Sequence, residues 1–189
     1  IVIEGGLADV VNDGLVSGSR IATHVLNGGT VLNNGTMLGG VVFASTGTAG
    51  TLTNEGTISS EFYNGYGVIM NKGGLFTNRG SASFKDIAQG FMSFGNVTLI
   101  NSGTLRAEAA DSNTTQTSGA LFQSGNIEVS NSGLIEGRDL GMYFYQGTAD
   151  LTNSGTIKGL RLDAVNMGTA GVAEVPQTGG AVLGGRHGL

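Results

Sequence analysis

The sequence predicts an all-β fold: a single-stranded, right-handed parallel β-helix, or β-solenoid, of about seven rungs. Each rung would hold about 22 residues and three short strands, a length typical of one repeat in a solenoid. Three observations lead to this prediction. An Asn-x-Gly phrase recurs along the chain, apolar and polar residues alternate around it, and glycine supplies 35 of the 189 residues. A unit of this kind buries its apolar face only when copies stack on one another.

The recurring phrase is Asn-x-Gly followed by Thr, Ser or Leu and then an apolar residue. From one asparagine to the next, the sequence positions increase by 21, 21, 24, 23, 30 and 22. Glycine, and less readily asparagine, accepts the positive φ of a sharp corner, so each copy predicts a corner between two strands. Stacked asparagines are expected to hydrogen-bond from rung to rung as a structural ladder. The ladder would consist of Asn12, Asn33, Asn54, Asn78, Asn101, Asn131 and Asn153.

Alternation on both sides of the phrase predicts the strands. The residue two places before each asparagine is apolar: Val10, Val31, Leu52, Phe76, Leu99, Val129 and Leu151. The residue four places after it is also apolar: Val16, Met37, Ile58, Ala82, Leu105, Ile135 and Ile157. A period of two is typical of a strand with one buried face. A third apolar segment, such as 67–70 or 141–144, supplies the third strand, and crossovers between parallel strands favour a right-handed coil.

The chain divides into two parts. Residues 1–167 form the predicted β-helix. Residues 168–189 lack the phrase, are rich in glycine and contain the single proline, Pro176. Because the terminal repeats of solenoids are usually atypical, we expect this part to be an irregular end segment or cap, or the beginning of a further part.

Composition excludes several classes of function. The formal charge is −5, from 9 basic and 14 acidic residues, and no basic patch is present, so we expect no nucleic-acid partner. The chain has no cysteine, so disulfides and thiolate metal sites are excluded. No apolar segment approaches the length that a membrane-spanning helix needs, so we expect no membrane insertion by this segment. No cofactor is predicted.

The segments around the Asn-x-Gly motif resemble the repeats of a known protein family. The segments 52–58, 129–135 and 151–157 resemble the rungs of bacterial autotransporter passenger domains, and 24–36 is similar to the Gly-Gly repeats of self-associating adhesins in that group. The resemblance covers about residues 5–167. It implies a secreted domain displayed at the outer membrane of a Gram-negative cell and active in cell adhesion and biofilm formation. Similar rungs also occur in other secreted adhesins and in phage tail proteins.

The sequence does not predict an enzyme. A hydrolytic triad needs a nucleophile, a base and an orienting group, but the two histidines, His24 and His187, lie near opposite ends of the column. The nearest carboxylate pairs are Glu108 with Asp111 and Glu136 with Asp139. Their members fall on different faces of the rung, so we interpret them as solvated surface charge.

The longest period, from Asn101 to Asn131, contains a polar surplus. It predicts a loop over residues 107–117 that leaves the column, and insertions of this kind either carry binding or reflect tolerated drift. The candidate binding residues are Arg106, Glu108, Asp111, Asn113 and Gln116.

Two further surface features are predicted. Arg106, Glu136 and Lys158 share one outward position on three rungs, which favours a neutralised edge over a binding stripe. Tyr143 and Tyr145 are expected to face outward if Phe144 faces inward, where they would suit contact with sugars or proteins.

These observations favour a secreted or cell-surface adhesion and self-association domain. Its partners would be further copies of itself, met laterally or end to end, or glycans or proteins on host or neighbouring cells. Two alternatives remain open at this point. One is a polysaccharide-active enzyme or phage tail module on the same fold, and the other is a subunit of an extracellular filament.

Overall fold

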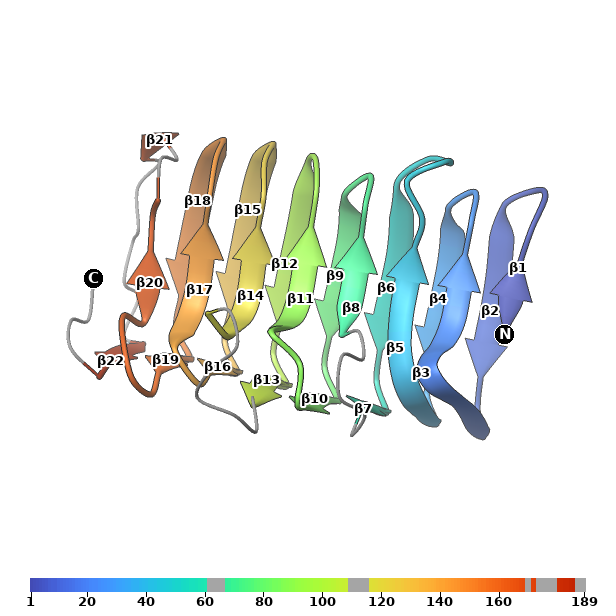
Figure 1. Ribbon diagram of the computed structural model, residues 1–189, viewed down its shortest axis with the longest axis horizontal. Coiled ribbons are helices and arrows are strands. Elements are labelled where there is room, and N and C mark those ends of the chain that lie inside the picture. Colours follow the sequence, from blue (N-terminus) through green and yellow to red (C-terminus); the bar gives the residue numbers. More distant parts are fainter. Residues whose placement is uncertain (61–66, 109–115, 169–170, 173–179, 186–189) are drawn as a thin grey trace.

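The computed structural model describes residues 1–60, 67–108, 116–168, 171–172 and 180–185. These residues form a β-solenoid of stacked turns with the two termini at opposite ends of its long axis (Figure 1). Every strand pairing in this part of the chain is parallel. The described residues include no helix that is long and apolar enough to cross a membrane. We number the rungs 1 to 7 by their ladder asparagines, from Asn12 to Asn153.

The first column of strands is an eight-stranded parallel sheet, and its first seven strands each end at a ladder asparagine. The strands are β2 (Ala8–Asn12), β4 (Gly29–Asn33), β6 (Gly50–Asn54), β9 (Gly74–Asn78), β12 (Val97–Asn101), β15 (Asn126–Asn131), β18 (Thr148–Asn153) and β21 (Gly171–Val172). The asparagines are register partners along the whole sheet, from β2 to β18.

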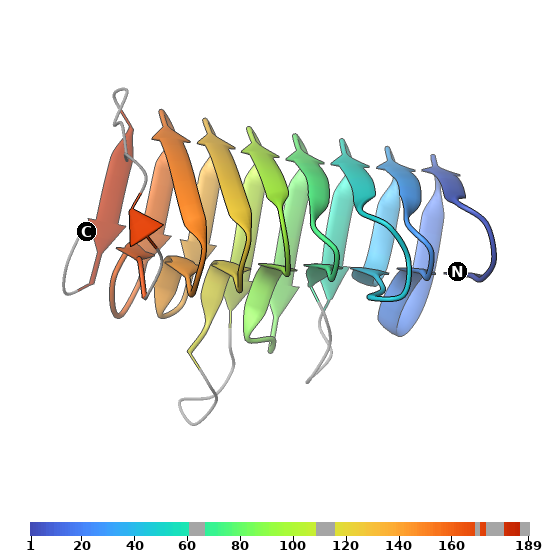
Figure 2. The ribbon, with the colours of Figure 1, turned by 90° about the horizontal axis from the view of Figure 1, so that it is seen from above.

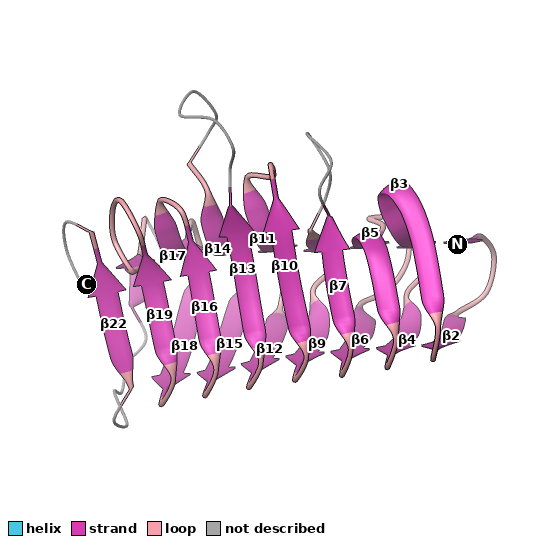
Figure 3. Cartoon of the chain, turned by 90° about the horizontal axis from the view of Figure 1, so that it is seen from below, coloured by secondary structure: helices cyan, strands magenta, loops and turns pink. Residues whose placement is uncertain are grey.

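The second and third columns follow the Asn-x-Gly corner and belong to one 14-stranded sheet (Figure 3). The second column holds β7 (Thr57–Ser60), β10 (Ser81–Lys85), β13 (Thr104–Glu108), β16 (Leu134–Gly137), β19 (Thr156–Gly159) and β22 (Ala181–Gly184). The third column holds β8 (Val68–Met70), β11 (Gln89–Ser93), β14 (Ser118–Phe122), β17 (Leu140–Phe144) and β20 (Val165–Asn166). The predicted parallel β-helix with three strands per rung is therefore confirmed from rung 3 onward.

Rungs 1 and 2 differ, because one long strand covers both the second and the third column. These strands are β3 (Leu15–Val25) and β5 (Thr36–Phe43), and the short β1 (Val2–Ile3) pairs with the end of β3. The register of β3 against β5 shifts between Ser17 and Thr23. Gly39, with a φ of 113°, lets β5 bend here without an intervening loop. Two strands per rung, not three, describe this end.

The column also continues past residue 167, where an irregular segment was expected. Strand β21 pairs with β18, and β22 pairs with β19 over four residues. Gly180 aligns with Gly155 of the preceding rung, and Val182 takes the place of Ile157 and packs against the core. Alternation thus persists after the Asn-x-Gly phrase is lost. The remaining residues of 168–189 that the structure does not describe are 169–170, 173–179 and 186–189.

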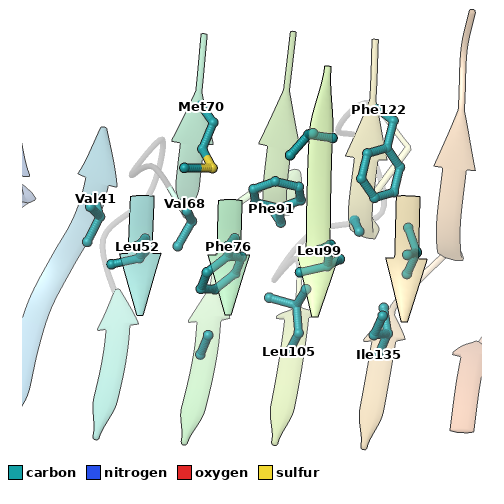
Figure 4. Packing of buried hydrophobic residues seen from close by; sticks show 14 of the residues in the cluster. Val41, Leu52, Val68, Met70, Phe76, Phe91, Leu99, Leu105, Phe122 and Ile135 are labelled. Atoms are coloured by element: carbon teal, nitrogen blue, oxygen red, sulfur yellow. The ribbon is translucent and has the colours of Figure 1, made fainter. Parts of the chain in front are cut away.

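The strands of successive rungs stack along the solenoid (Figure 2), and the core side chains lie between the columns (Figure 4). The inward side chains come from every second strand residue, as in β15, where buried and exposed residues alternate throughout. Four phenylalanines form a continuous row of ring contacts, which are tilted, edge-to-face and stacked in turn. The ring centroids are 5.3 Å apart for Phe76–Phe91, 5.7 Å for Phe91–Phe122 and 4.8 Å for Phe122–Phe144. Such contacts add about 0.5–1.5 kcal/mol each beyond the burial of apolar area.

Candidate functional site

The seven ladder asparagines form one uninterrupted chain of hydrogen bonds. Each Nδ2 donates to the Oδ1 of the asparagine in the next rung, with six distances of 2.7–2.8 Å. The side chains are buried, at 0–6% exposure. The same nitrogen also donates to a backbone carbonyl of the next rung, such as Thr104 O from Asn78, at 2.9 Å. Because a buried amide is costly to leave unpaired, this ladder stabilises the stack and is a structural element of the corner.

Backbone hydrogen bonds complete each corner. The carbonyl oxygen of one ladder asparagine accepts from two N–H groups of the next corner, as Asn101 O does from Ser132 and Gly133 at 2.8 and 3.1 Å. The corner glycine leaves no room for a side chain. A Cβ on Gly103 would lie 2.0 Å from the carbonyl oxygen of Gly80. The close approach of successive corners therefore requires glycine at the third position of the phrase.

The charged positions of the second column are neutralised. Glu136 is 6% exposed and forms ion pairs with Arg106, whose Nε lies 2.7 Å away, and with Lys158, whose Nζ lies 3.4 Å away. Arg106 Nε also lies 2.9 Å from Glu108. This arrangement matches the neutralised edge that the sequence favoured. The predicted carboxylate pair of Glu136 and Asp139 is divided between two ion-pair networks. Glu136 contacts Arg106 and Lys158, whereas Asp139 contacts Arg161 at 3.5 Å.

The candidate binding loop is only partly described. Arg106 and Glu108 belong to strand β13 and not to a loop, and Gln116 is exposed just before β14. Ala107 and Thr117 are buried at 1% exposure, so the predicted loop boundaries of 107–117 are too wide. Alternation carries the strand to Glu108, because Ala107 aligns with Phe84 of β10 and Gly137 of β16. Asp111 and Asn113 lie outside the described residues.

The third column presents aromatic side chains on both of its faces. Phe144 is fully buried, whereas Tyr145 is 43% exposed and Tyr143 is half-buried. The two tyrosine rings meet edge to face, with centroids 6.1 Å apart. The predicted alternation across Phe144 is confirmed. No described contact assigns a ligand to the tyrosines.

The outward face of the first column is a broad, regular surface. Its side chains come from the positions one and three residues before each ladder asparagine. In rungs 2 to 5 these are uncharged residues, each a threonine or an aliphatic residue, and all but the buried Thr77 are at least partly exposed: Thr30, Leu32, Thr51, Thr53, Leu75, Thr77, Thr98 and Ile100. Rungs 6 and 7 instead carry Glu128 and Asp150. No Lys or Arg occupies either position in the seven strands from β2 to β18.

An open groove of about 420 Å³ lies over the start of strands β12, β15 and β18. The side chains of Thr98, Glu128, Asp150, Asn96 and Asn126 are among those that line it. Glu128 and Asp150 are exposed register partners on adjacent strands. Thr98 Oγ1 donates to Glu128 at 3.4 Å, and neither carboxylate has a cationic partner in the described part of the chain.

A second amide and hydroxyl ladder forms one wall of this groove. Asn126 N–H donates to Asn96 Oδ1 at 2.9 Å, and Thr148 Oγ1 donates to Asn126 Oδ1 at 2.9 Å. The Nδ2 groups of Asn96 and Asn126 make no hydrogen bond within the described residues. The groove thus combines free amide donors with free carboxylate acceptors. Sequence reasoning missed it, although Glu128 and Asp150 occupy the same place in consecutive repeats.

The described residues contain no group of three or more His, Asp or Glu side chains placed to hold a metal ion. His24 lies in strand β3, and His187 falls outside the described residues. Among the described residues, no histidine lines the groove with Glu128 and Asp150.

These features define a β-solenoid protein with a structural asparagine ladder and a polar outer face. Comparison with protein-family models, with curated proteins and with solved structures finds no match.

Proposed function

We propose that the chain is a secreted or surface-displayed bacterial adhesion and self-association domain of the autotransporter passenger type. The observation that supports this proposal is the outer face of the first column in rungs 2 to 5. It is regular, uncharged and rich in hydroxyl groups, which donate and accept hydrogen bonds equally well. Because rungs repeat at about 4.8 Å, two columns that lie side by side meet matching groups along their whole length.

The size of this face sets the strength of such a contact. Four strands at about 4.8 Å, each about five residues long, cover about 19 Å by about 16 Å. The footprint of about 300 Å² is well below the roughly 800 Å² per partner of a standard stable interface. A single pair of columns should therefore bind weakly, whereas many copies on one surface should bind firmly through avidity.

Beads coated with the domain provide the test. We expect coated beads to aggregate, and we expect Thr51→Glu, in the middle of this face, to reduce aggregation by placing like charges opposite each other. Thr57→Glu is the matched control, since it changes an outward threonine of the same rung in the second column. Beads that stay dispersed, or equal effects of the two variants, would contradict the proposal.

A further inference from the structure

The groove over β12, β15 and β18 has the chemistry of a saccharide site, and we infer that it binds a neutral, hydroxyl-rich glycan chain. This inference goes beyond self-association, because the groove lies toward the C-terminal end of the first column. The proposed self-association face lies in rungs 2 to 5, and only Thr98 is shared between the two surfaces.

The groove offers both hydrogen-bond acceptors and hydrogen-bond donors. A sugar hydroxyl is both donor and acceptor, so it is recognised best where a protein acceptor and a protein donor lie together. The carboxylates of Glu128 and Asp150 supply acceptors, and the Nδ2 groups of Asn96 and Asn126 supply donors. The oxygens of these two amides are already occupied, by Asn126 N–H and by Thr148 Oγ1. Each amide is thereby held with its free NH₂ group as the unsatisfied part.

The two carboxylates of the groove differ from other carboxylates of the chain in having no cationic partner among the described residues. Glu55 contacts Arg79 at 2.5 Å, and Glu136 has two cationic partners. Glu128 and Asp150 stand side by side without one, and like charges opposite each other in a sheet are unfavourable. Hydroxyl donors from a bound chain would relieve this repulsion. An anionic glycan would increase it, so the inference is limited to neutral chains.

The shape of the groove favours a chain-like ligand. The groove crosses three rungs, and a polar side chain stands at each of two aligned positions at every step of about 4.8 Å. A site that is long, open and repetitive fits a segment of a polymer better than a single small molecule. Because it lies open to water, each contact is weak, and we expect a dissociation constant in the millimolar range.

Titration of isotope-labelled protein with maltohexaose, cellohexaose and mannohexaose, followed by amide NMR shifts, tests the inference. We expect at least one hexaose to shift the amides of Thr98, Glu128 and Asp150. Glu128→Ala and Asp150→Ala should each weaken binding by at least about tenfold. Asp9→Ala is the matched control, because Asp9 has the same place in rung 1, and it should change binding by less than about twofold.

Three results would overturn the inference. They are the absence of shifts with every hexaose, equal losses in the Asp9 and Glu128 variants, and shifts of the same amides by Ca²⁺ alone. Bead aggregation is measured without oligosaccharide, and the groove variants should leave it unchanged. Failure of saccharide binding is therefore distinguishable from failure of self-association.

Discussion

Two corners of the same rung behave differently. The Asn-x-Gly corner between the first and second columns keeps its asparagine and its glycine in all seven rungs, and six hydrogen bonds join the successive asparagines. The corner between the second and third columns varies in length. The chain from the ladder asparagine to the aligned third-column residue is short in rung 2, from Asn33 to Val41, and more than twice as long in rung 5, from Asn101 to Ala120.

This difference shows that the register between rungs is fixed at the first corner, whereas the number of residues per rung varies at the second corner. The first corner is fixed, because each asparagine must meet the next at hydrogen-bonding distance and its glycine meets backbone on all but the first rung. The second corner also makes hydrogen bonds to neighbouring rungs, such as Asp139 N–H to Thr117 O at 3.1 Å, but among the described residues these bonds do not repeat from rung to rung with the same residue types. Spacings between asparagines therefore vary from 21 to 30 without any break in the ladder.

The largest expected effect comes from cutting the variable corner too deeply. Deletion of 107–117 removes the buried Ala107 and Thr117, so we expect loss of cooperative unfolding. Deletion of 109–115 alone leaves two residues, Gln116 and Thr117, to connect β13 with β14. Rung 6 makes the same connection, from β16 to β17, with the two residues Arg138 and Asp139. This shorter deletion should change the free energy of unfolding by less than about 1 kcal/mol, because closure entropy depends weakly on length. Circular dichroism during chemical denaturation measures both, and equal behaviour of the two deletions would refute the assigned boundary.

The ladder itself provides the second prediction. Asn131→Leu removes the Oδ1 that accepts from Asn101 Nδ2 and the Nδ2 that donates to Asn153 Oδ1. Loss of these two buried hydrogen bonds should cost about 1–3 kcal/mol. The midpoint of urea unfolding should fall accordingly. Asn34→Leu is the control, since Asn34 is an exposed residue within the same kind of corner and should change stability by less than about 0.5 kcal/mol.

Glycine at the fixed corner gives a smaller effect. Gly103→Ala places a Cβ 2.0 Å from a backbone oxygen, and the neighbouring corner must move, at about 1–3 kcal/mol. Gly14→Ala changes the same position in rung 1, where nothing lies within 4 Å, and should be nearly neutral. A thermal unfolding midpoint that falls equally in both variants would show that close stacking is not the reason for glycine.

The row of charged side chains formed by Arg106, Glu136 and Lys158 should have the smallest effect on stability. Glu136→Gln removes two ion pairs, but Arg106 and Lys158 are 42% and 39% exposed. Because both cations are partly exposed to water, we expect each pair to contribute only about 1 kcal/mol although Glu136 is buried, and salt weakens the pairs further. We expect a small loss of stability at low salt that shrinks at high salt, and bead aggregation close to that of the parent protein. A strong loss of aggregation would make this stripe part of the contact.

Much of the fold was predictable because the Asn-x-Gly phrase marks register directly. Once the asparagines are aligned, the buried positions follow from alternation, as Leu52 and Ile58 show. The merged strands β3 and β5 were missed, since nothing in the phrase tells whether a bend contains a loop. Strand β22 was missed because Gly180 keeps the corner while the asparagine is lost. The groove was missed because Glu128 and Asp150 lie one full repeat apart in the chain and are close only in register.

Side-chain amide exchange tests the central claim, the continuous asparagine ladder, most directly. In an NMR hydrogen-exchange experiment, the Nδ2 protons of Asn33, Asn54, Asn78, Asn101 and Asn131 should exchange as slowly as strand backbone amides, because each is buried and hydrogen-bonded. The Nδ2 protons of the exposed Asn96 and Asn126 should exchange rapidly. Rapid exchange at the five ladder asparagines, in a protein whose strand amides remain protected, would contradict the account.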